Sequence, residues 1–206
     1  MTKNIIFDWS GVIKDSVKSH LWVVNKMFSK FGVNEISLEE LKENWEQPYM
    51  IFYNKYLPNL TIEEEQATYK EIILSKDCPK SMAYPGIIEL IKKIKEKDNF
   101  IAVISSDLPD TVFPEIRKYG LENIFDEIMI NIYNKTKAIR DLIKKREFNP
   151  KDTFFVGDSN HEIEAGKQTG VKTIAVTWGF STEQKLKLEK PDFIAHNLNE
   201  LEGTIL

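Results

Sequence analysis

The sequence predicts an α/β fold in which helices cover a parallel β-sheet and a small helical segment is inserted near the start. Six apolar runs of strand length occur, at residues 4–7, 100–104, 127–130, 153–156, 171–176 and 192–195. Helical patterns separate the later runs, for example the apolar positions Ile139, Leu142 and Ile143. This alternation is typical of parallel strands joined by helices. Residues 8–99 contain no strand-like run of comparable quality, and a crossover needs only about a dozen residues, which indicates an insertion.

The inserted segment is predicted to be a small α-helical cap domain over residues 15–82, with a core domain formed by residues 1–14 and 83–206. One helical stripe is made by Leu21, Val24, Phe28 and Phe31. The segments 37–40 and 61–64 have the sequence pattern of capping boxes, and prolines 48 and 58 mark breaks between helices.

An aromatic cluster lies within the predicted cap. Its members are Trp45, Tyr49, Phe52, Tyr53 and Tyr56. Their partly helical spacing favours packing inside the cap and against the core, with a wall facing the substrate as the alternative.

Composition limits the class of protein. The chain has 206 residues, of which 42% are hydrophobic and 29% charged, as in a folded globular protein. Its 28 basic and 32 acidic residues give no reason to expect nucleic acid or an anionic membrane as partner. Cys78 is the single cysteine, which excludes an intrachain disulfide and a cysteine-based metal site. The chain lacks a signal-peptide pattern and an apolar run of about 18 residues, so we expect a cytoplasmic protein, either monomer or homodimer.

Polar side chains occur where the predicted strands end. Asp8 ends the first strand, Ser105 and Ser106 end the second, and Asp158 ends the fourth. Lys135 lies just before the helix that leads into that fourth strand. Because ligands of open parallel sheets bind beyond the carboxyl ends of the strands, we expect these side chains to converge.

The predicted set has the chemistry of phosphoryl transfer. Asp8 and Asp158 can share Mg2+, which prefers oxygen ligands, while Asp8 keeps one oxygen free to attack phosphorus. Ser105 can donate a hydrogen bond to a phosphoryl oxygen, and Lys135 can neutralise charge. Further donors are expected from the backbone around Ser10, Gly11 and Ser106. The expected intermediate is an aspartyl-phosphate.

These motifs resemble those of the haloacid dehalogenase-like hydrolases. The resemblance rests on "FDWSGVIKDS" at residues 7–16, "VISSD" at 103–107, Lys135, and "FVGDSNHEIEAG" at 155–166, in the family's order across nearly the whole chain. The ending, with "VKTIAVTWGFS" and "PDFI", is similar to the branch that has a helical cap after the first motif. The resemblance implies a three-layer, Rossmann-like core.

The resemblance also implies a role for each residue. Asp8 is the expected nucleophile, the Ser10 carbonyl and Asp158 bind Mg2+, and Ser105 and Lys135 hold the phosphoryl group. Glu162 stands where the family usually has an Asp that ligates or supports the metal.

Several alternatives remain for neighbouring residues. Glu162 could instead be a first-turn acid favoured by the helix dipole. Lys137 precedes the same helix as Lys135 and is its rival. His20 and His161 are expected to pack or face solvent rather than bind a ligand.

Ser10 departs from the family pattern. Phosphatases of this family usually have a second Asp two residues after the nucleophile, which protonates the leaving group and then activates water. Losing such a group typically costs on the order of 10²–10⁴ in rate.

Three functions therefore compete. We favour a phosphatase acting on a small phosphorylated metabolite, with the proton supplied by the substrate, water or a cap residue. The first alternative is a phosphonate-cleaving enzyme in which a cap lysine, such as Lys42 or Lys55, forms an imine. The second is a non-catalytic regulatory protein that binds phosphate and Mg2+. Dehalogenation fits less well, because it does not require a metal site.

Overall fold

The computed structural model describes residues 2–206 and confirms the α/β fold. Six parallel strands form one sheet in the order β5-β4-β1-β6-β7-β8. Their bounds are β1 Asn4–Phe7, β4 Phe100–Ser105, β5 Glu127–Ile130, β6 Thr153–Gly157, β7 Lys172–Val176 and β8 Phe193–Ala195. Each predicted strand is present, with ends that differ from the prediction by no more than one residue.

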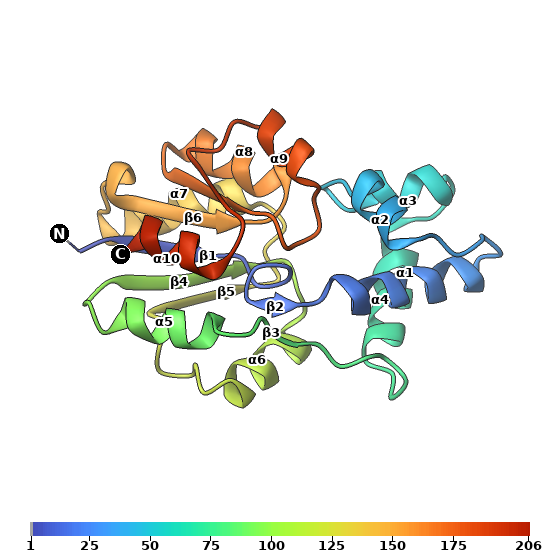
Figure 1. Cartoon of the computed structure of the whole chain (residues 1–206). Coiled ribbons are helices and arrows are strands. Elements are labelled where there is room, and N and C mark those ends of the chain that lie inside the picture. The colour runs from blue at the N-terminus through green and yellow to red at the C-terminus, as the bar shows by residue number, and fades with distance from the viewer. Residues whose placement is uncertain (1) are drawn as a thin grey trace.

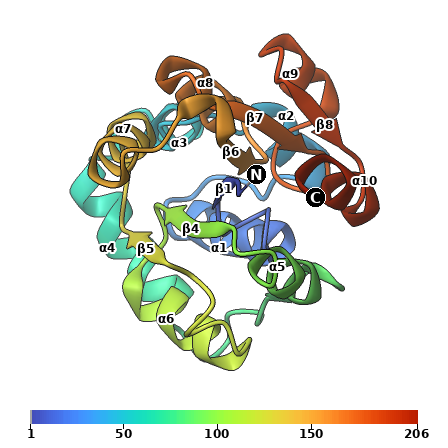
Figure 2. The same cartoon turned by 90° about the vertical axis from the view of Figure 1, so that its left-hand side faces the viewer.

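Helices cover both faces of this sheet (Figure 2). One face packs against α5 (Ile87–Lys95), α6 (Pro109–Lys118) and α10 (Leu198–Ile205), and the other against α7 (Lys135–Arg146), α8 (Asn160–Thr169) and α9 (Glu183–Leu188). Side chains alternate along β1, so that Ile5 and Phe7 join the first layer and Ile6 joins the second. A short 3-10 helix, η1 (Pro150–Asp152), precedes β6. Within residues 2–206, no helix is both long enough and apolar enough to cross a membrane.

Four further helices lie to one side of the sheet (Figure 1). They are α1 (Val17–Lys30), α2 (Leu38–Asn44), α3 (Met50–Tyr56) and α4 (Ile62–Ile73). Their apolar faces form a cluster of their own, in which Val24, Phe28, Leu41 and Phe52 are fully buried. Full burial of one such side chain contributes roughly 1.5–3 kcal/mol, so this cluster stabilises the packing of the four helices on one another.

A two-stranded ribbon stands where the chain leaves the core and where it returns. Strands β2 (Lys14–Asp15) and β3 (Met82–Ala83) pair antiparallel, with Lys14 opposite Ala83 and Asp15 opposite Met82. Two residue pairs leave no periodic pattern, which is why this ribbon was not predicted. On this basis we propose that residues 15–82 are a cap domain inserted between the core segments 1–14 and 83–206.

The two predicted capping boxes differ in the structure. At α4 the box is complete: Glu64 N donates to Thr61 Oγ1 at 3.2 Å, and Thr61 N donates to Glu64 Oε2 at 3.0 Å. At α2, Ser37 Oγ accepts from Glu40 N at 3.1 Å, but the Glu40 carboxylate accepts from Tyr56 Oη instead. A contact within the cap therefore replaces the second half of that box.

Candidate active site

The central strand β1 brings three of the predicted residues to one edge of the sheet. Its last residue, Phe7, is in register with Val103 of β4 and Val156 of β6. Asp8, Ser105 and Asp158 then follow at adjacent strand ends, and all three line a cavity of about 370 Å³. The chain adds strands on one side of β1 through β5 and on the other from β6 onward, so this is the topological switch point where open sheets bind ligands.

Lys135 connects the nucleophile candidate to the fourth motif. Its Nζ lies 2.7 Å from Asp8 Oδ1 and 2.7 Å from Glu162 Oε1, with all three side chains buried. Burial alone would lower the pKa of Lys135, but the charges of Asp8 and Glu162 outweigh this and raise it. The rival Lys137 lies at the surface and pairs with Asp141. The structure therefore places Lys135, and not Lys137, beside Asp8.

The site holds more negative than positive charge. Asp8, Asp158 and Glu162 surround the single ammonium of Lys135, which leaves two negative charges in excess if all are ionised. Burial raises the pKa of Asp8 to about 7 against the lowering effect of Lys135. Burial also raises the pKa of Asp158 well above its usual value, and the charges of Glu162 and Asp8 add to this effect. A divalent cation would relieve this repulsion.

Asp158 is held tightly between two backbone segments. A Cβ at Gly11 would lie 2.2 Å from Asp158 Oδ2, and one at Gly179 would lie 2.0 Å from it, so both positions require glycine. Gly11 also has a φ of +82°. Asp158 Oδ2 accepts a hydrogen bond from Phe180 N at 2.6 Å.

The donor set fits Mg2+. In the part of the chain that the structure describes, Asp8 Oδ2 and Asp158 Oδ1 accept no hydrogen bond from protein, so one oxygen of each is free. Among these same residues, no group of three or more His, Cys, Asp or Glu side chains is placed to hold a metal. Mg2+ keeps several waters and needs only one or two protein carboxylates, so two free oxygens are sufficient.

Glu162 has both of its carboxylate oxygens occupied by protein donors. Oε1 accepts from Lys135, while Oε2 accepts from Ser159 N at 2.7 Å and from the Ser159 hydroxyl, which completes a capping box at the start of α8. In this arrangement Glu162 caps its helix and holds Lys135 in position.

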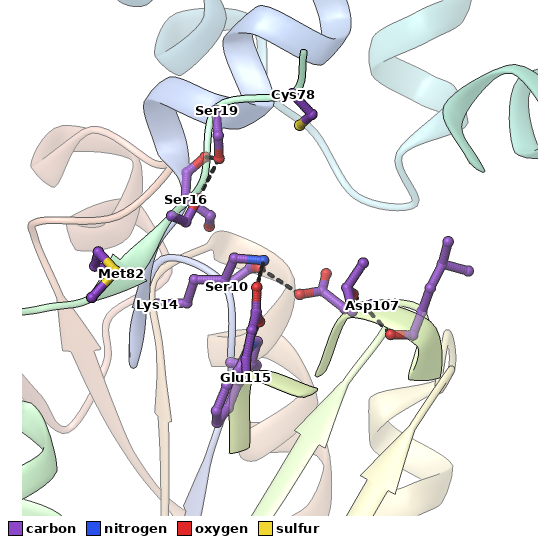
Figure 3. A network of polar contacts seen from close by, with 12 residues as sticks. Ser10, Lys14, Ser16, Ser19, Cys78, Met82, Asp107 and Glu115 are labelled. Atoms are coloured by element: carbon purple, nitrogen blue, oxygen red, sulfur yellow. Dashed lines mark hydrogen bonds and ion pairs between the residues drawn. The ribbon is translucent and has the colours of Figure 1, made fainter. Parts of the chain in front are cut away.

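Ser10 contacts a carboxylate that the sequence analysis did not assign (Figure 3). Its Oγ donates to Asp107 Oδ2 at 2.5 Å. Asp107 N in turn donates to Ser105 Oγ at 3.1 Å, which leaves the Ser105 hydroxyl hydrogen free for another acceptor. Asp107 is the last residue of the quoted "VISSD", so the signal in the sequence is the acid that ends the second motif. Ser106 also lines the cavity.

The loop after β1 is fixed by a second polar group. Gly11 N donates to Lys14 O at 2.8 Å, so the Gly11 amide already has an acceptor and is not free for a phosphoryl oxygen. Lys14 Nζ lies 2.7 Å from Glu115 Oε1, and Trp9 Nε1 donates to Glu115 Oε2 at 2.8 Å. Figure 3 shows Lys14 and Glu115 next to Ser10.

The aromatic cluster of the cap divides between the two predicted roles. Phe52 and Tyr56 pack on Phe28 inside the cap, with ring centroids 6.2 and 4.8 Å away. Trp45, Tyr49 and Tyr53 also line the cavity.

His20 joins this wall of the cavity as well. Its ring centroid lies 4.7 Å from that of Trp45 and 5.2 Å from that of Phe180, and burial lowers its pKa to about 4. The cavity is therefore bounded by the strand ends on one side and by aromatic side chains on the other. The cap lysine that lines it is Lys70, not Lys42 or Lys55.

Known proteins resemble the whole chain. The family model described as haloacid dehalogenase-like hydrolase matches residues 5–176. A phosphoglycolate phosphatase from Synechococcus elongatus is 24% identical over 202 residues, covering 96% of this chain and 94% of that protein. The pyrophosphatase PpaX from Oceanobacillus iheyensis is 22% identical over 205 residues, covering 97% and 94%. A solved haloacid dehalogenase-like hydrolase from Streptococcus pneumoniae has a TM-score of 0.84 at 19% identity, covers 100% of this chain and 99% of that chain, and shows the same fold.

Proposed function

Because the chain belongs to the haloacid dehalogenase-like hydrolase family, we propose that it is a Mg2+-dependent phosphatase acting on a small phosphorylated metabolite. The observation that carries this proposal is the position of Asp8. It ends the central strand, binds Lys135 through one oxygen and has the other free. The names of two relatives, phosphoglycolate phosphatase and pyrophosphatase, support a small phosphorylated substrate.

The residues at the strand ends divide the work of the first half-reaction. Asp8 Oδ1, beside the Lys135 ammonium, attacks phosphorus, and the bond to the leaving oxygen breaks as the aspartyl-phosphate forms, which leaves Oδ2 to hold Mg2+. Ser105 donates its hydroxyl hydrogen to a phosphoryl oxygen, and Lys135 offsets the negative charge on Asp8 and on the phosphoryl group. Asp8, Asp158 and the Ser10 carbonyl would hold Mg2+, which supplies further neutralisation of the phosphoryl oxygens.

Asp107 is our candidate for the missing acid and base. A serine hydroxyl by itself is a poor general acid and a poor general base at neutral pH. The Ser10 hydroxyl, however, donates a hydrogen bond to the Asp107 carboxylate at 2.5 Å. When protonated, Asp107 returns a proton to Ser10 as Ser10 protonates the leaving oxygen. In the second half-reaction water attacks the phosphoryl group, gives its proton to Ser10, and the Ser10 proton passes back to Asp107. The Asp107 carboxylate would thus do the work of the family's usual Asp at position 10, with the Ser10 hydroxyl passing the proton between it and the substrate.

The test is phosphate release from an aryl phosphate, whose good leaving group needs little acid. We expect release that requires Mg2+ and that falls at least about 10⁴-fold in Asp8→Asn, because that variant lacks the nucleophile. Asp77→Asn is the matched control, since Asp77 is exposed in a turn of the cap, and it should retain full activity.

Two other outcomes would favour the alternatives. Absence of turnover on a broad phosphate panel, with Mg2+ binding intact, would favour the non-catalytic binding protein. Release of phosphate from phosphonates alone, with trapping of a substrate imine by borohydride, would favour the phosphonate-cleaving enzyme. Lys70 is then the lysine to examine, because it is the cap lysine that lines the cavity.

A small-molecule substrate and a cytoplasmic location complete this proposal. They are supported by the acidic charge balance and the single cysteine.

A further inference from the structure

Glu65 is a buried carboxylate in the cap wall of the cavity. It belongs to α4, is 3% exposed and lines the same cavity as Asp8. Its neighbours Glu63 and Glu64 on the first turn are exposed. A charged side chain in such a position is costly unless an opposite charge or hydrogen bonds compensate it.

The lysines that line the cavity are already paired with other carboxylates. Lys14 pairs with Glu115 at 2.7 Å, Lys70 with Asp110 at 3.3 Å, and Lys135 with Asp8 at 2.7 Å. Within residues 2–206, Glu65 takes part in no ion pair within 4 Å. Among the described residues, this wall therefore carries one carboxyl group that has no cation of its own.

Tyrosine side chains line the same cavity as this carboxylate. The ring centroid of Tyr49 lies 6.3 Å from that of Tyr53 and 6.0 Å from that of Tyr133. Glu65, Tyr49, Tyr53 and Tyr133 line the same cavity, and besides burial the charge of Glu65 raises the pKa of Tyr53 and of Tyr133. The Tyr53 hydroxyl is buried and has no hydrogen-bond partner among the described residues. Ring faces beside a carboxylate form a site that attracts organic cations.

Tyr69 and Tyr133 line the cavity that Glu65 shares with the strand ends. Burial raises the pKa of Tyr69 and of Tyr133, and in both cases the charges of Asp107 and Glu65 add to the effect. Asp107 is beside Ser10, at the reaction end of the cavity. Glu65 and the phosphoryl site therefore belong to one cavity with aromatic side chains in its lining, so one ligand can contact both.

We infer that the substrate carries an organic ammonium group, which binds between Glu65 and the tyrosines that line the cavity while its phosphate lies at Asp8. This inference rests on the proposed function and adds the class of substrate: a phosphate monoester of an amino alcohol. The ammonium supplies the positive charge that no lysine supplies to Glu65, and the ring faces contact its carbon substituents.

The test compares matched substrates that differ only at the far end. O-Phosphoethanolamine and longer ω-aminoalkyl phosphates are compared with ω-hydroxyalkyl phosphates of the same length. We expect kcat/KM to favour the amino compound about tenfold at the best length. Glu65→Gln should abolish this preference, because it removes the carboxylate that attracts the ammonium. Glu63→Gln, the exposed control on the same helix, should keep it.

Binding separates this inference from the proposed function. In Asp8→Asn, calorimetry should show tighter binding of the amino than of the hydroxy compound, and Glu65→Gln added to that variant should remove the difference. Loss of all turnover with this binding preference intact would overturn only the phosphatase. Normal aryl phosphate hydrolysis with equal kcat/KM for both series, or equal loss on both in Glu65→Gln, would overturn only the ammonium site.

Discussion

The core wall and the cap wall of the cavity differ in how their carboxylates are paired with cations. On the core wall, Asp8, Lys135 and Glu162 form a chain of contacts at 2.7 Å, complete before any substrate arrives. On the cap wall, Glu65 has aromatic neighbours and no cation within the described chain. The core wall is therefore organised for a reaction shared by many substrates, and the cap wall for a feature of one class of substrate. Substitutions on the core wall should therefore reduce stability or the rate of the reaction, whereas substitutions on the cap wall should change substrate preference and the pH dependence of stability.

Removing the ammonium from the core wall should cause the largest loss of stability. In Lys135→Met, Asp8 and Glu162 remain buried without their shared cation, and breaking such a buried pair costs about 3–5 kcal/mol. We expect the free energy of unfolding, measured with urea, to fall by about this amount.

The exposed neighbour Lys137 is the matched control for this comparison. Its pair with Asp141 lies at the surface, so Lys137→Met should change the free energy of unfolding by less than about 0.5 kcal/mol. Similar losses in both variants would show that the contacts of Lys135 do not stabilise the core wall.

Removing the Asp107 carboxylate should slow the reaction most for substrates whose leaving group must be protonated. In Asp107→Asn we expect kcat on alkyl phosphates to fall about 10²-fold, with a much smaller loss on aryl phosphates. Parallel kinetics on the two substrate classes measure the difference.

Ser10→Ala provides the control, because the proposed relay needs both residues. It should reproduce the selective loss, and the double variant should lose no more than either single variant. Additive losses, or equal losses on alkyl and aryl phosphates, would exclude a proton path through Ser10.

The smallest expected effect is a pH dependence of stability on the cap wall. Burial raises the pKa of Glu65 from 4.5 to about 7. Between these values the folded protein binds a proton that the unfolded chain has lost, so Glu65 destabilises the fold increasingly as pH rises. The difference in the free energy of unfolding between Glu65→Gln and the wild type, measured with urea, should therefore increase by about 1–2 kcal/mol in favour of the variant between pH 4.5 and a pH above 7. Parallel pH curves would contradict a buried ionising Glu65.

The same division explains what the sequence could predict. The strand ends that carry Asp8, Ser105 and Asp158 follow apolar runs, and parallel strands necessarily bring their carboxyl ends together. Lys135 was found through its place in the family pattern. These residues are close in space because of the sheet, whose order follows from local patterns and short connections.

The remaining contacts depend on how segments far apart in the sequence pack together, which local patterns do not encode. Glu65 follows two other acids in the first turn of α4, where acids usually stabilise the helix dipole, so nothing distinguished the one that faces inward. Asp107 was visible beside the second motif, but its contact with Ser10 joins residues 97 positions apart. The aromatic cluster was predicted as a unit, although its members divide between the cap interior and the cavity.

The ribbon of β2 and β3 also makes the molecule suitable for replacement of its cap by another helical unit. All six strands of the main sheet lie outside residues 16–81, and the chain leaves and returns at two adjacent paired segments. A graft of another helical unit between Asp15 and Met82 would therefore cut no strand of the main sheet and move no residue of the core wall. The grafted unit would mainly need an apolar surface that buries Phe180, the core residue that packs in the cap cluster.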